Sequence, residues 1–435
     1  METVDKLEKF NLHKSVFNND IDTLKLQLKS GVYDINQKDI FGNTPLHLAV
    51  MLGFVECAKI ITEHNADTSI KNNDGWTPLA EAVSYGNRTS IKQVLKRVKQ
   101  QSRNSFDDRK PKLVETLNKF EDFQLKIKWE FHSWVPLISR FLPSDTCNIS
   151  KKGSNIRMDT TLIEFTDMKW HRGDISFLFS GSAGSSIMVL DNKKKVYQKL
   201  RQNDLETELN DEIDFLMSSD IVSAQISTKT IEFVPAQSGW IFKEDKMELI
   251  GDMNCEVYNV QGMTLTTRKR REHLTEDDLQ KNKAMVEAIS NGSSIVEKCE
   301  VDRRESLPPP PACPFSWEEY IKASGMPCIG RSPKVVENKR TMKVNVCMNQ
   351  NFPLTTDLIL GVLNVVAPSK HFEKIKEFVS LKLPTGFPVK IEIPVLPTVV
   401  ARVTFQDFKW KNDFPDDLFS IPSDYTEDPF HFPDL

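Results

Sequence analysis

Hydrophobic and polar positions repeat with a period of 33 residues in the first hundred residues of the chain. Thr44–His47 returns as Thr77–Ala80, and Gly42 returns as Gly75. A more divergent copy, one residue longer, begins at Leu12. Each copy holds two short segments in which apolar residues recur three and four positions apart, the spacing of one helix face. The pattern therefore predicts a stack of helix pairs.

The residues that open each helix pair are those of ankyrin repeats. Thr44 and Thr77 stand where a side-chain oxygen can cap a helix. Pro45 and Pro78 follow in the first turn, where no amide donor is lost. Together with the 33-residue period, this is the ankyrin signature. We expect an α-solenoid of about three ankyrin repeats over residues 1–100, followed by a second domain.

Ankyrin stacks bind other proteins through the tips of their hairpins and their inner helices. Two full hairpins make only a small concave surface, so we expect a helper surface of modest affinity. An alternative interpretation is that an aromatic residue after a hairpin glycine, such as Trp76 after Gly75, simply packs internally. The candidate partner-binding residues are Lys38, Asp39, Ile40, Phe41, Asn73, Asp74 and Trp76.

The last helix of the third repeat is basic. Ile91, Val94 and Leu95 alternate with Lys92 and Lys96 along it. This helix is either a solvent-exposed cap of the stack or a surface for an acidic partner. A polar, charged stretch over residues 99–112 is expected to separate the repeats from the second domain.

The remaining two-thirds of the chain, residues 113–435, is dominated by strand patterns. Apolar and polar residues alternate with a period of two from Phe123 to Phe131, which is typical of a half-buried strand. Ser180–Ser186 lacks the lysine and following helix of a phosphate loop, so a hairpin connection is favoured. Further extended segments are expected at 160–165, 174–179, 186–190, 195–200, 230–234 and 255–260. The prediction is an α+β domain with mostly antiparallel strands.

Helical patterns interrupt these strands at residues 134–142, 358–366 and 372–379. The first of the three is either a core helix or a lipid-binding one. Strands are expected again at 389–395 and 399–405, and Pro394 and Pro397 are expected to confine them to a sheet edge or a bend.

Two further segments have open interpretations. Four consecutive prolines within residues 302–314 predict polyproline II, as a semi-rigid linker or as a ligand for an aromatic groove. Arg268–Arg271 is either a nuclear-import signal or a solvated charge pattern beside an acidic helix.

Composition adds mainly exclusions. A net charge of −4 over 435 residues gives no basic excess, so no nucleic-acid partner is expected. The charged first residues do not form a signal peptide, and the longest uncharged aliphatic run, Leu358–Pro368, is too short to span a bilayer. Seven scattered cysteines without zinc spacing favour a reduced, cytosolic protein. Catalytic and nucleotide-binding signatures are absent, so we expect no enzyme activity, no cofactor and no metal.

Several blocks of the sequence resemble the ankyrin repeat domain thirteen family, whose C-terminal region is called the GPCR-chaperone domain. Their number and order, together with the repeats, cover nearly the whole chain. The blocks are Lys128–Phe131, Ser133–Leu137, Arg157–Leu162, Thr267–Glu276 and Gly386–Pro394.

One branch of that family is similar in architecture but carries ubiquitin-interacting motifs and works at endosomes and the plasma membrane. Such a motif needs an acidic run and then Leu-x-x-Ala on one helix face. The nearest candidate, Glu276–Leu279, has Asn282 where the alanine belongs. Ala367–Phe372 and Val403–Phe408 resemble the other branch, the C type, which lacks ubiquitin-interacting motifs and works at the endoplasmic reticulum.

The resemblance to this second branch implies a function and a location. It implies a non-enzymatic chaperone or retention factor for newly made G-protein-coupled receptors, associated peripherally with the cytosolic face of the endoplasmic reticulum. Its partners would be the cytosolic segments of those receptors. The alternative is an ankyrin adaptor in the endocytic traffic of ubiquitinated membrane receptors.

Overall fold

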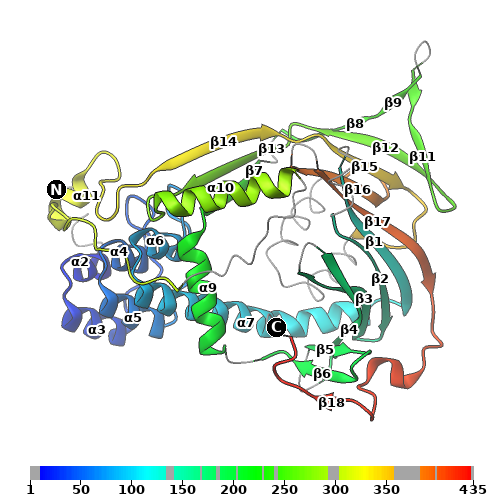
Figure 1. Ribbon diagram of the computed structural model, residues 1–435, viewed down its shortest axis with the longest axis horizontal. Helices are drawn as coiled ribbons and strands as arrows, with labels where there is room; N and C mark the ends of the chain where they lie inside the picture. The colour runs from blue at the N-terminus through cyan, green and yellow to red at the C-terminus, as the bar shows by residue number, and fades with distance from the viewer. Residues whose placement is uncertain are drawn as a thin grey trace.

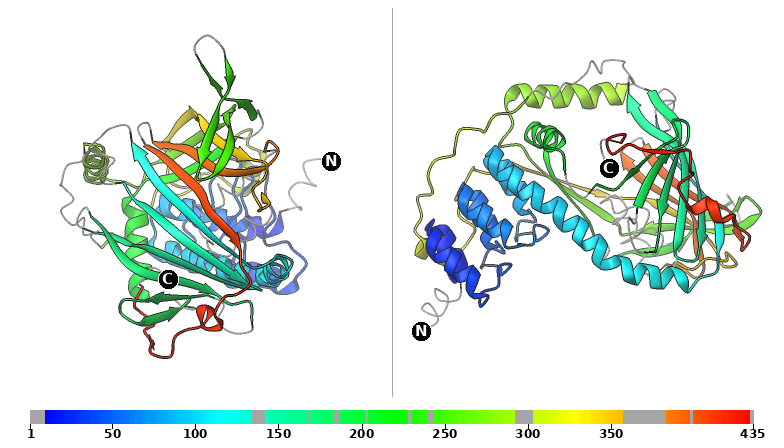
Figure 2. Two further views of the ribbon diagram at one scale, coloured as in Figure 1. Left: turned by 90° about the vertical axis from the view of Figure 1, so that its right-hand side faces the viewer. Right: turned by 90° about the horizontal axis from the view of Figure 1, so that it is seen from below.

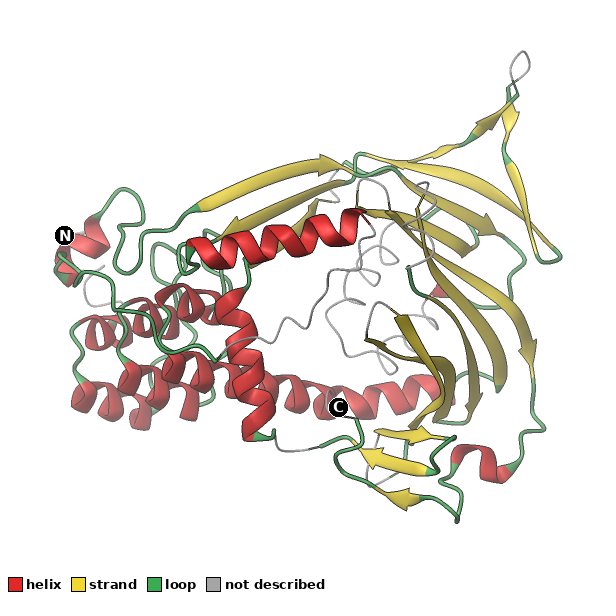
Figure 3. Cartoon of the chain, in the orientation of Figure 1, coloured by secondary structure: helices red, strands yellow, loops and turns green. Residues whose placement is uncertain are grey.

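A computed structural model describes residues 10–133, 142–166, 169–182, 187–201, 204–227, 230–239, 243–291, 303–356, 383–396 and 399–432. Short helices gather at one end of the molecule and a large curved sheet at the other (Figure 3). A long helix joins the two ends along one side, and a narrow three-stranded sheet joins them along the opposite side (Figure 1).

The short helices form the predicted stack of three ankyrin helix pairs. Thr44 caps its helix by accepting a hydrogen bond from the backbone amide of His47, and Thr77 accepts one from Ala80 in the next repeat. The expected solenoid is therefore confirmed. The helices are α2 Asn11–Phe17, α3 Ile21–Ser30, α4 Pro45–Met51, α5 Val55–Glu63, α6 Pro78–Tyr85 and α7 Arg88–Asn118.

Helix α7 is much longer than an ankyrin helix. Its 31 residues span about 46 Å at 1.5 Å per residue. Ile91 and Val94 at its start lie in the core of the ankyrin stack, whereas Leu113 and Leu117 near its end lie in the core under the large sheet. Residues 99–112, expected as a polar separator, are the middle of this helix (Figure 2). The helix therefore anchors both ends of the molecule.

The large sheet has thirteen strands within the described residues, in the order β11-β12-β15-β16-β17-β1-β2-β3-β4-β5-β6-β18, with β8 also paired to β12. Among the described pairs, only that of β18 with β6 is parallel, so the predicted α+β class with mostly antiparallel strands is confirmed. The bounds are β1 Phe123–Ser133, β2 Ser144–Lys152, β3 Asn155–Thr166, β4 Lys169–Phe179, β5 Ile187–Asp191, β6 Val196–Lys199, β8 Glu232–Pro235, β11 Met247–Ile250, β12 Met253–Gln261, β15 Val344–Asn349, β16 Phe387–Leu396, β17 Val399–Trp410 and β18 Thr426–Glu427.

Strand β16 lies between β15 and β17, so of the two expected alternatives, a sheet edge or a bend, the edge was wrong. Pro394 is accommodated because the pairing with β15 ends at Glu392, and the register with β17 shifts between Pro394 and Leu396. The predicted helices at 358–366 and 372–379, and nearly all of the one at 134–142, lie outside the described residues.

The three-stranded sheet consists of β7 Ile221–Ser227, β13 Thr264–Arg270 and β14 Val335–Thr341, in the order β14-β13-β7. A two-stranded hairpin, β9 Gln237–Ser238 and β10 Glu244–Asp245, projects from the far corner (Figure 1). The other helices within the described residues are α9 Glu206–Ser218, α10 Glu276–Asn291, α11 Trp317–Lys322 and the 3-10 turn η1 Asp416–Phe419.

The core of the ankyrin stack is completed by residues from far along the chain. Leu209 and Ile213 of α9, and Trp317, Tyr320 and Ile321 of α11, belong to the same buried cluster as the repeat helices. The repeats therefore do not form a separate hydrophobic unit. Within the described residues, no helix combines the length and the apolar character needed to cross a membrane.

Candidate protein-interaction site

The two ankyrin hairpins are built alike. One carboxylate oxygen of Asp39 accepts hydrogen bonds from the backbone amides of Phe41 and Asn43, at 2.9 and 2.8 Å. In the second hairpin the side-chain oxygen of Asn72 accepts one from the amide of Trp76 at 3.0 Å. These bonds hold each tip in a tight turn that projects from the stack.

Three of the seven predicted partner-binding residues are not exposed. Asp39, Phe41 and Trp76 keep only 7%, 7% and 4% of their surface, so the expectation of an exposed surface was wrong for them. The burial comes from other parts of the same chain. The other four residues, Lys38, Ile40, Asn73 and Asp74, are exposed, and their binding of a partner stays a prediction.

Helix α11 covers the first hairpin. Ser316 and Glu319 close its start with a reciprocal capping box. The ring of Tyr320 packs edge-on against Phe41, with centroids 5.0 Å apart. Its hydroxyl donates to the second carboxylate oxygen of Asp39, the one that accepts no hairpin amide, at 2.7 Å. Burial raises the pKa of both groups, and the Tyr320 hydrogen bond partly offsets this effect on the pKa of Asp39.

Asn43 completes this contact. Its side-chain amide donates to the Tyr320 hydroxyl at 2.9 Å, and Asn43 itself is fully buried. Polar groups removed from water in this way are costly unless each finds a partner. The hydroxyl of Tyr320 accepts from Asn43 and donates to Asp39, so it provides a hydrogen-bond partner for both buried groups of the hairpin.

Strand β13 covers the second hairpin. The guanidinium of Arg270 stacks over the ring of Trp76, 5.1 Å from its centroid. It pairs with Glu81 at 2.9 Å and with Glu272 at 2.7 Å. It also donates to the hydroxyl of Ser84 at 2.7 Å. Arg270 therefore ties the second part of the chain to helix α6 of the last repeat.

The two carboxyls of this cluster titrate in opposite directions. Burial raises the pKa of Glu81, against the attraction of Arg270. Burial also acts to raise the pKa of Glu272, but Arg270 and a hydrogen bond from Ser84 outweigh it, so the pKa is lowered. Arg270 keeps only 3% of its surface, so the interpretation of the basic run as a solvated charge pattern is wrong for this residue. The other three residues of the run, Arg268, Lys269 and Arg271, keep 39%, 42% and 43% of their side-chain surface and form ion pairs with Glu337 or Asp220.

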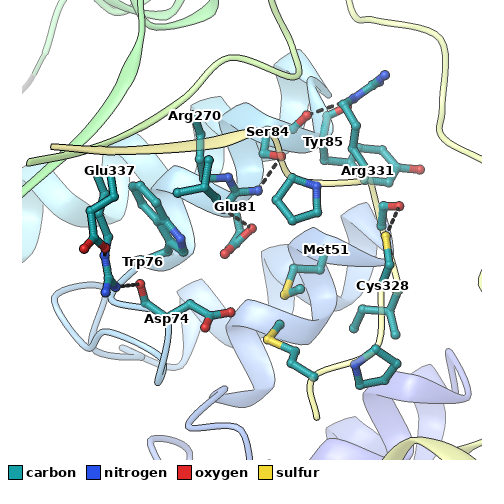
Figure 4. Close-up of a pocket in the computed structure, with 17 residues that line it drawn as sticks. Met51, Asp74, Trp76, Glu81, Ser84, Tyr85, Arg270, Cys328, Arg331 and Glu337 are labelled. Carbon is teal, nitrogen blue, oxygen red and sulfur yellow. Dashed lines mark hydrogen bonds and ion pairs between the residues drawn. The ribbon is translucent and has the colours of Figure 1, made fainter.

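A cleft of about 310 Å³ opens between the last two repeats and the segment from Met326 to Glu337. Arg331 lies on its wall and donates to the backbone oxygens of Ser84 and Tyr85, at 3.0 and 3.1 Å (Figure 4). Arg268 is paired with Glu337 at 2.6 Å. Arg270, the third cation of the lining, is paired with Glu81 and Glu272. All three cations already have partners, so the cleft suits a neutral or apolar side chain better than an anion.

The proline-rich segment lies along the ankyrin stack. The amide of Leu307 donates to the carbonyl of Gly86 at 2.9 Å, and the carbonyl of Pro308 accepts from Arg331 at 2.8 Å. Leu307 packs against the ankyrin core. The segment predicted as a semi-rigid linker is thus held against the repeats, by Gly86 on one side and by Arg331 on the other.

The basic face of α7 meets an acidic partner within the chain. Lys92 and Lys96 both pair with Glu206 at the start of α9, and Lys99 pairs with Glu212 at 2.7 Å. The acidic partner is therefore supplied within the chain. The pairs lie at the surface, since Lys96 and Glu206 keep 47% and 59% of their side-chain surface, so the face remains solvated.

Sequence reasoning missed the residues that cover the hairpins. No pattern in the sequence pairs Arg270 with Glu81, which lies 189 residues away. One signal for α11 was present: a Ser-x-x-Glu capping box at Ser316, followed by Tyr320 and Ile321 on the face of Trp317. The described residues contain no group of three or more side chains that could hold a metal ion.

Comparison with known proteins agrees with this architecture. A family model described as ANKRD13 C-terminal matches residues 157–426, and one described as ankyrin repeats (3 copies) matches residues 12–104. The chain belongs to the ANKRD13 family. Family members of this architecture carry ankyrin repeats, which are protein-interaction units, so protein partners are implied.

Two kinds of relative within the family are matched at different levels. Ankyrin repeat domain-containing protein 13C of Xenopus tropicalis is 52% identical, over 98% of this chain and 84% of that protein. The Homo sapiens protein of the same name is also 52% identical, over 98% and 79%. Ankyrin repeat domain-containing protein 13B of Mus musculus is 34% identical, over 91% and 67%. The predicted resemblance to the 13C type is therefore confirmed.

Proposed function

We propose that this protein is a non-enzymatic chaperone or retention factor for newly made G-protein-coupled receptors. It acts on the cytosolic face of the endoplasmic reticulum and controls receptor biogenesis and export. The observation that carries the proposal is the 52% identity with 13C-type relatives over 98% of the chain. The receptor role itself comes from the branch of the family that this chain resembles.

The mechanism needs no cofactor. A protein that binds a cytosolic receptor segment more tightly before the receptor helices are packed, and less tightly afterwards, holds the immature form and releases the mature one. Differential affinity for the two folding states is sufficient for such release. Helix α7 contributes buried residues both to the core of the ankyrin stack and to the core under the large sheet, and this coupling supports a binding surface that is formed before the client binds.

The endocytic alternative is disfavoured by the contacts of helix α10. In the sequence closest to a ubiquitin-interacting motif, Asp278 is buried and paired with Arg304. Asn282 donates to the carbonyl of Ser218 at 3.0 Å. These residues are occupied within the chain and do not form an exposed recognition face.

The test is a crosslinked capture from cells that express the full chain and a G-protein-coupled receptor. Enrichment of the immature, high-mannose receptor over the mature glycoform is the expected result. Capture of only the mature, ubiquitinated receptor would move the assignment to the endocytic adaptor. ATP-dependent release of receptor from the purified complex would refute the mechanism.

A further inference from the structure

Strand β14 forms one edge of the three-stranded sheet. It pairs antiparallel with β13 along its whole length, from Val335 opposite Arg270 to Thr341 opposite Thr264. Within the described residues no strand pairs with its other side. In Figure 1 it is the outermost strand along the upper side of the molecule.

The free side of β14 is open to solvent. Every residue from Ser332 to Lys339 is exposed, and Val335 and Val336 keep 48% and 57% of their surface. In an antiparallel edge strand, alternate residues point both the amide and the carbonyl away from the sheet. Seven residues give a row of such groups about 23 Å long, a ready template for another extended chain.

The charge along this edge is strongly positive. From Lys334 to Lys343 there are four basic residues and one acidic residue. That acid, Glu337, is already paired with Arg268 at 2.6 Å and with Lys339 at 3.2 Å. Lys334 and Lys343 are exposed and form no ion pair within the described part of the chain. An extended segment with acidic side chains would complement this edge.

We propose that β14 binds an acidic, extended peptide segment of a partner protein by strand addition. Backbone hydrogen bonds to the open side of β14 would supply affinity, and the lysines would select acidic side chains. Val335 and Val336 would contact apolar residues of the added strand. The inference goes beyond the proposed function, because it does not require the partner to be a receptor.

A second copy of this chain fits the edge less well. Antiparallel pairing of two β14 strands would bring the basic residues of one copy close to those of the other, and like charges directly opposite destabilise a sheet. The same lysines that repel a second copy attract an acidic strand. The edge is thus selective rather than generally adhesive.

The probe is a fluorescein-labelled, eight-residue peptide of alternating glutamate and valine, titrated with the full chain and followed by fluorescence anisotropy. We expect saturable binding that weakens as salt rises, and none for the matching lysine–valine peptide. Two further versions of the peptide distinguish strand addition from charge attraction. One carries N-methyl groups on the odd-numbered residues and the other on the even-numbered residues, so each blocks the amides on one side of the added strand. One version should lose binding at least tenfold and the other should retain it.

Two triple variants, each with three lysines replaced by glutamate, change the net charge equally. One alters β14 and its flanks, and the other alters the ankyrin stack. Lys334→Glu with Lys339→Glu and Lys343→Glu should weaken binding of the glutamate–valine peptide at least tenfold. A control triple replaces exposed lysines of the ankyrin stack that form no ion pair among the described residues and should bind within twofold of the unmodified chain. The control substitutions are Lys25→Glu, Lys29→Glu and Lys71→Glu.

Three results would overturn the proposal. Equal binding of both N-methylated peptides would mean that no strand is added. Equal loss in both triple variants would mean that the peptide senses only net charge. A concentration-dependent dimer of the unmodified chain, abolished by the β14 triple variant and insensitive to the peptide, would assign the edge to a second copy.

Discussion

Replacing Arg270 by methionine removes the positive charge that holds the ankyrin repeats to the second part of the chain. Methionine fills much of the same space and keeps the contact with Trp76, so the change tests charge rather than packing. The side chains of Arg270, Glu81 and Glu272 are 3%, 5% and 2% exposed. Removing the cation leaves two buried carboxyls without their main partner.

The size of the effect follows from that burial. Breaking a buried ion pair by removing one member costs about 3–5 kcal/mol, because the remaining charge is uncompensated. Protonating one of the two carboxyls would remove its uncompensated charge. At pH 7, neutralising a group with the ordinary pKa of 4.5 costs about 3.4 kcal/mol. We therefore expect the free energy of unfolding to fall by about 3 kcal/mol or more.

The loss of stability in the Arg270 variant should grow as the pH rises. In the variant, Glu81 loses the guanidinium that lowers its pKa, while burial continues to raise it. A carboxyl whose folded pKa lies above its unfolded pKa takes up a proton on folding, so the variant loses stability as pH rises above about 4.5. The difference from the unmodified chain should grow by up to about 1.4 kcal/mol per pH unit between pH 5.5 and 7.5.

The assay is urea unfolding followed by circular dichroism at both pH values. Arg268→Met is the matched control, because this neighbour is 39% exposed and its partner Glu337 faces solvent, where ion pairs contribute little. Adding Glu81→Gln to the Arg270 variant should restore part of the stability and reduce the pH dependence. A loss below about 1 kcal/mol that is equal at both pH values would refute the reasoning.

Two further substitutions test the segments that cover the repeats. Tyr320→Phe should cost about 1.5–3 kcal/mol in urea unfolding, and more at pH 7.5 than at pH 4, because the buried Asp39 loses a donor and its pKa rises further; an unchanged unfolding midpoint would contradict this. Gly86→Ala should lower stability by at least about 1 kcal/mol more than Gly31→Ala in the same measurement. Both glycines have positive φ, but only at Gly86 would the new methyl group meet another side chain, that of Leu307 at 2.5 Å. Equal losses of stability for the two variants would mean that the segment carrying Leu307 moves aside without cost.

Elements whose signals are local could be predicted from the residues alone. The Thr-Pro pairs at Thr44 and Thr77 specify capped helices, because the caps and the periodic apolar residues lie within one or two turns of each other. Strict alternation between Phe123 and Phe131 likewise specified a strand. The 33-residue period turned these helices into a stack, since each repeat needs its neighbour to bury its apolar face.

Local signals were misleading where a residue's partner lies far away in the chain. The charges of residues 99–112 suggested a separator, yet this segment is helical. Phe106 packs into the core under the large sheet, and Lys99 and Arg103 pair with acids in or just before α9. Arg270 looked like part of a solvated basic run. It is buried because Glu81 supplies its counter-charge across 189 residues.

Which segments cover the ankyrin hairpins, and which strand edge stays exposed, depends on contacts between distant parts of the chain. Hairpin residues such as Phe41 and Trp76 were predicted to face a partner, but the chain's own α11 and β13 lie against them. The open edge of β14 was equally hidden from the sequence, since an edge is defined by the absence of a neighbouring strand among the described residues. Residue patterns fix which face of an element is apolar, whereas the choice of what packs on that face is made by the whole chain.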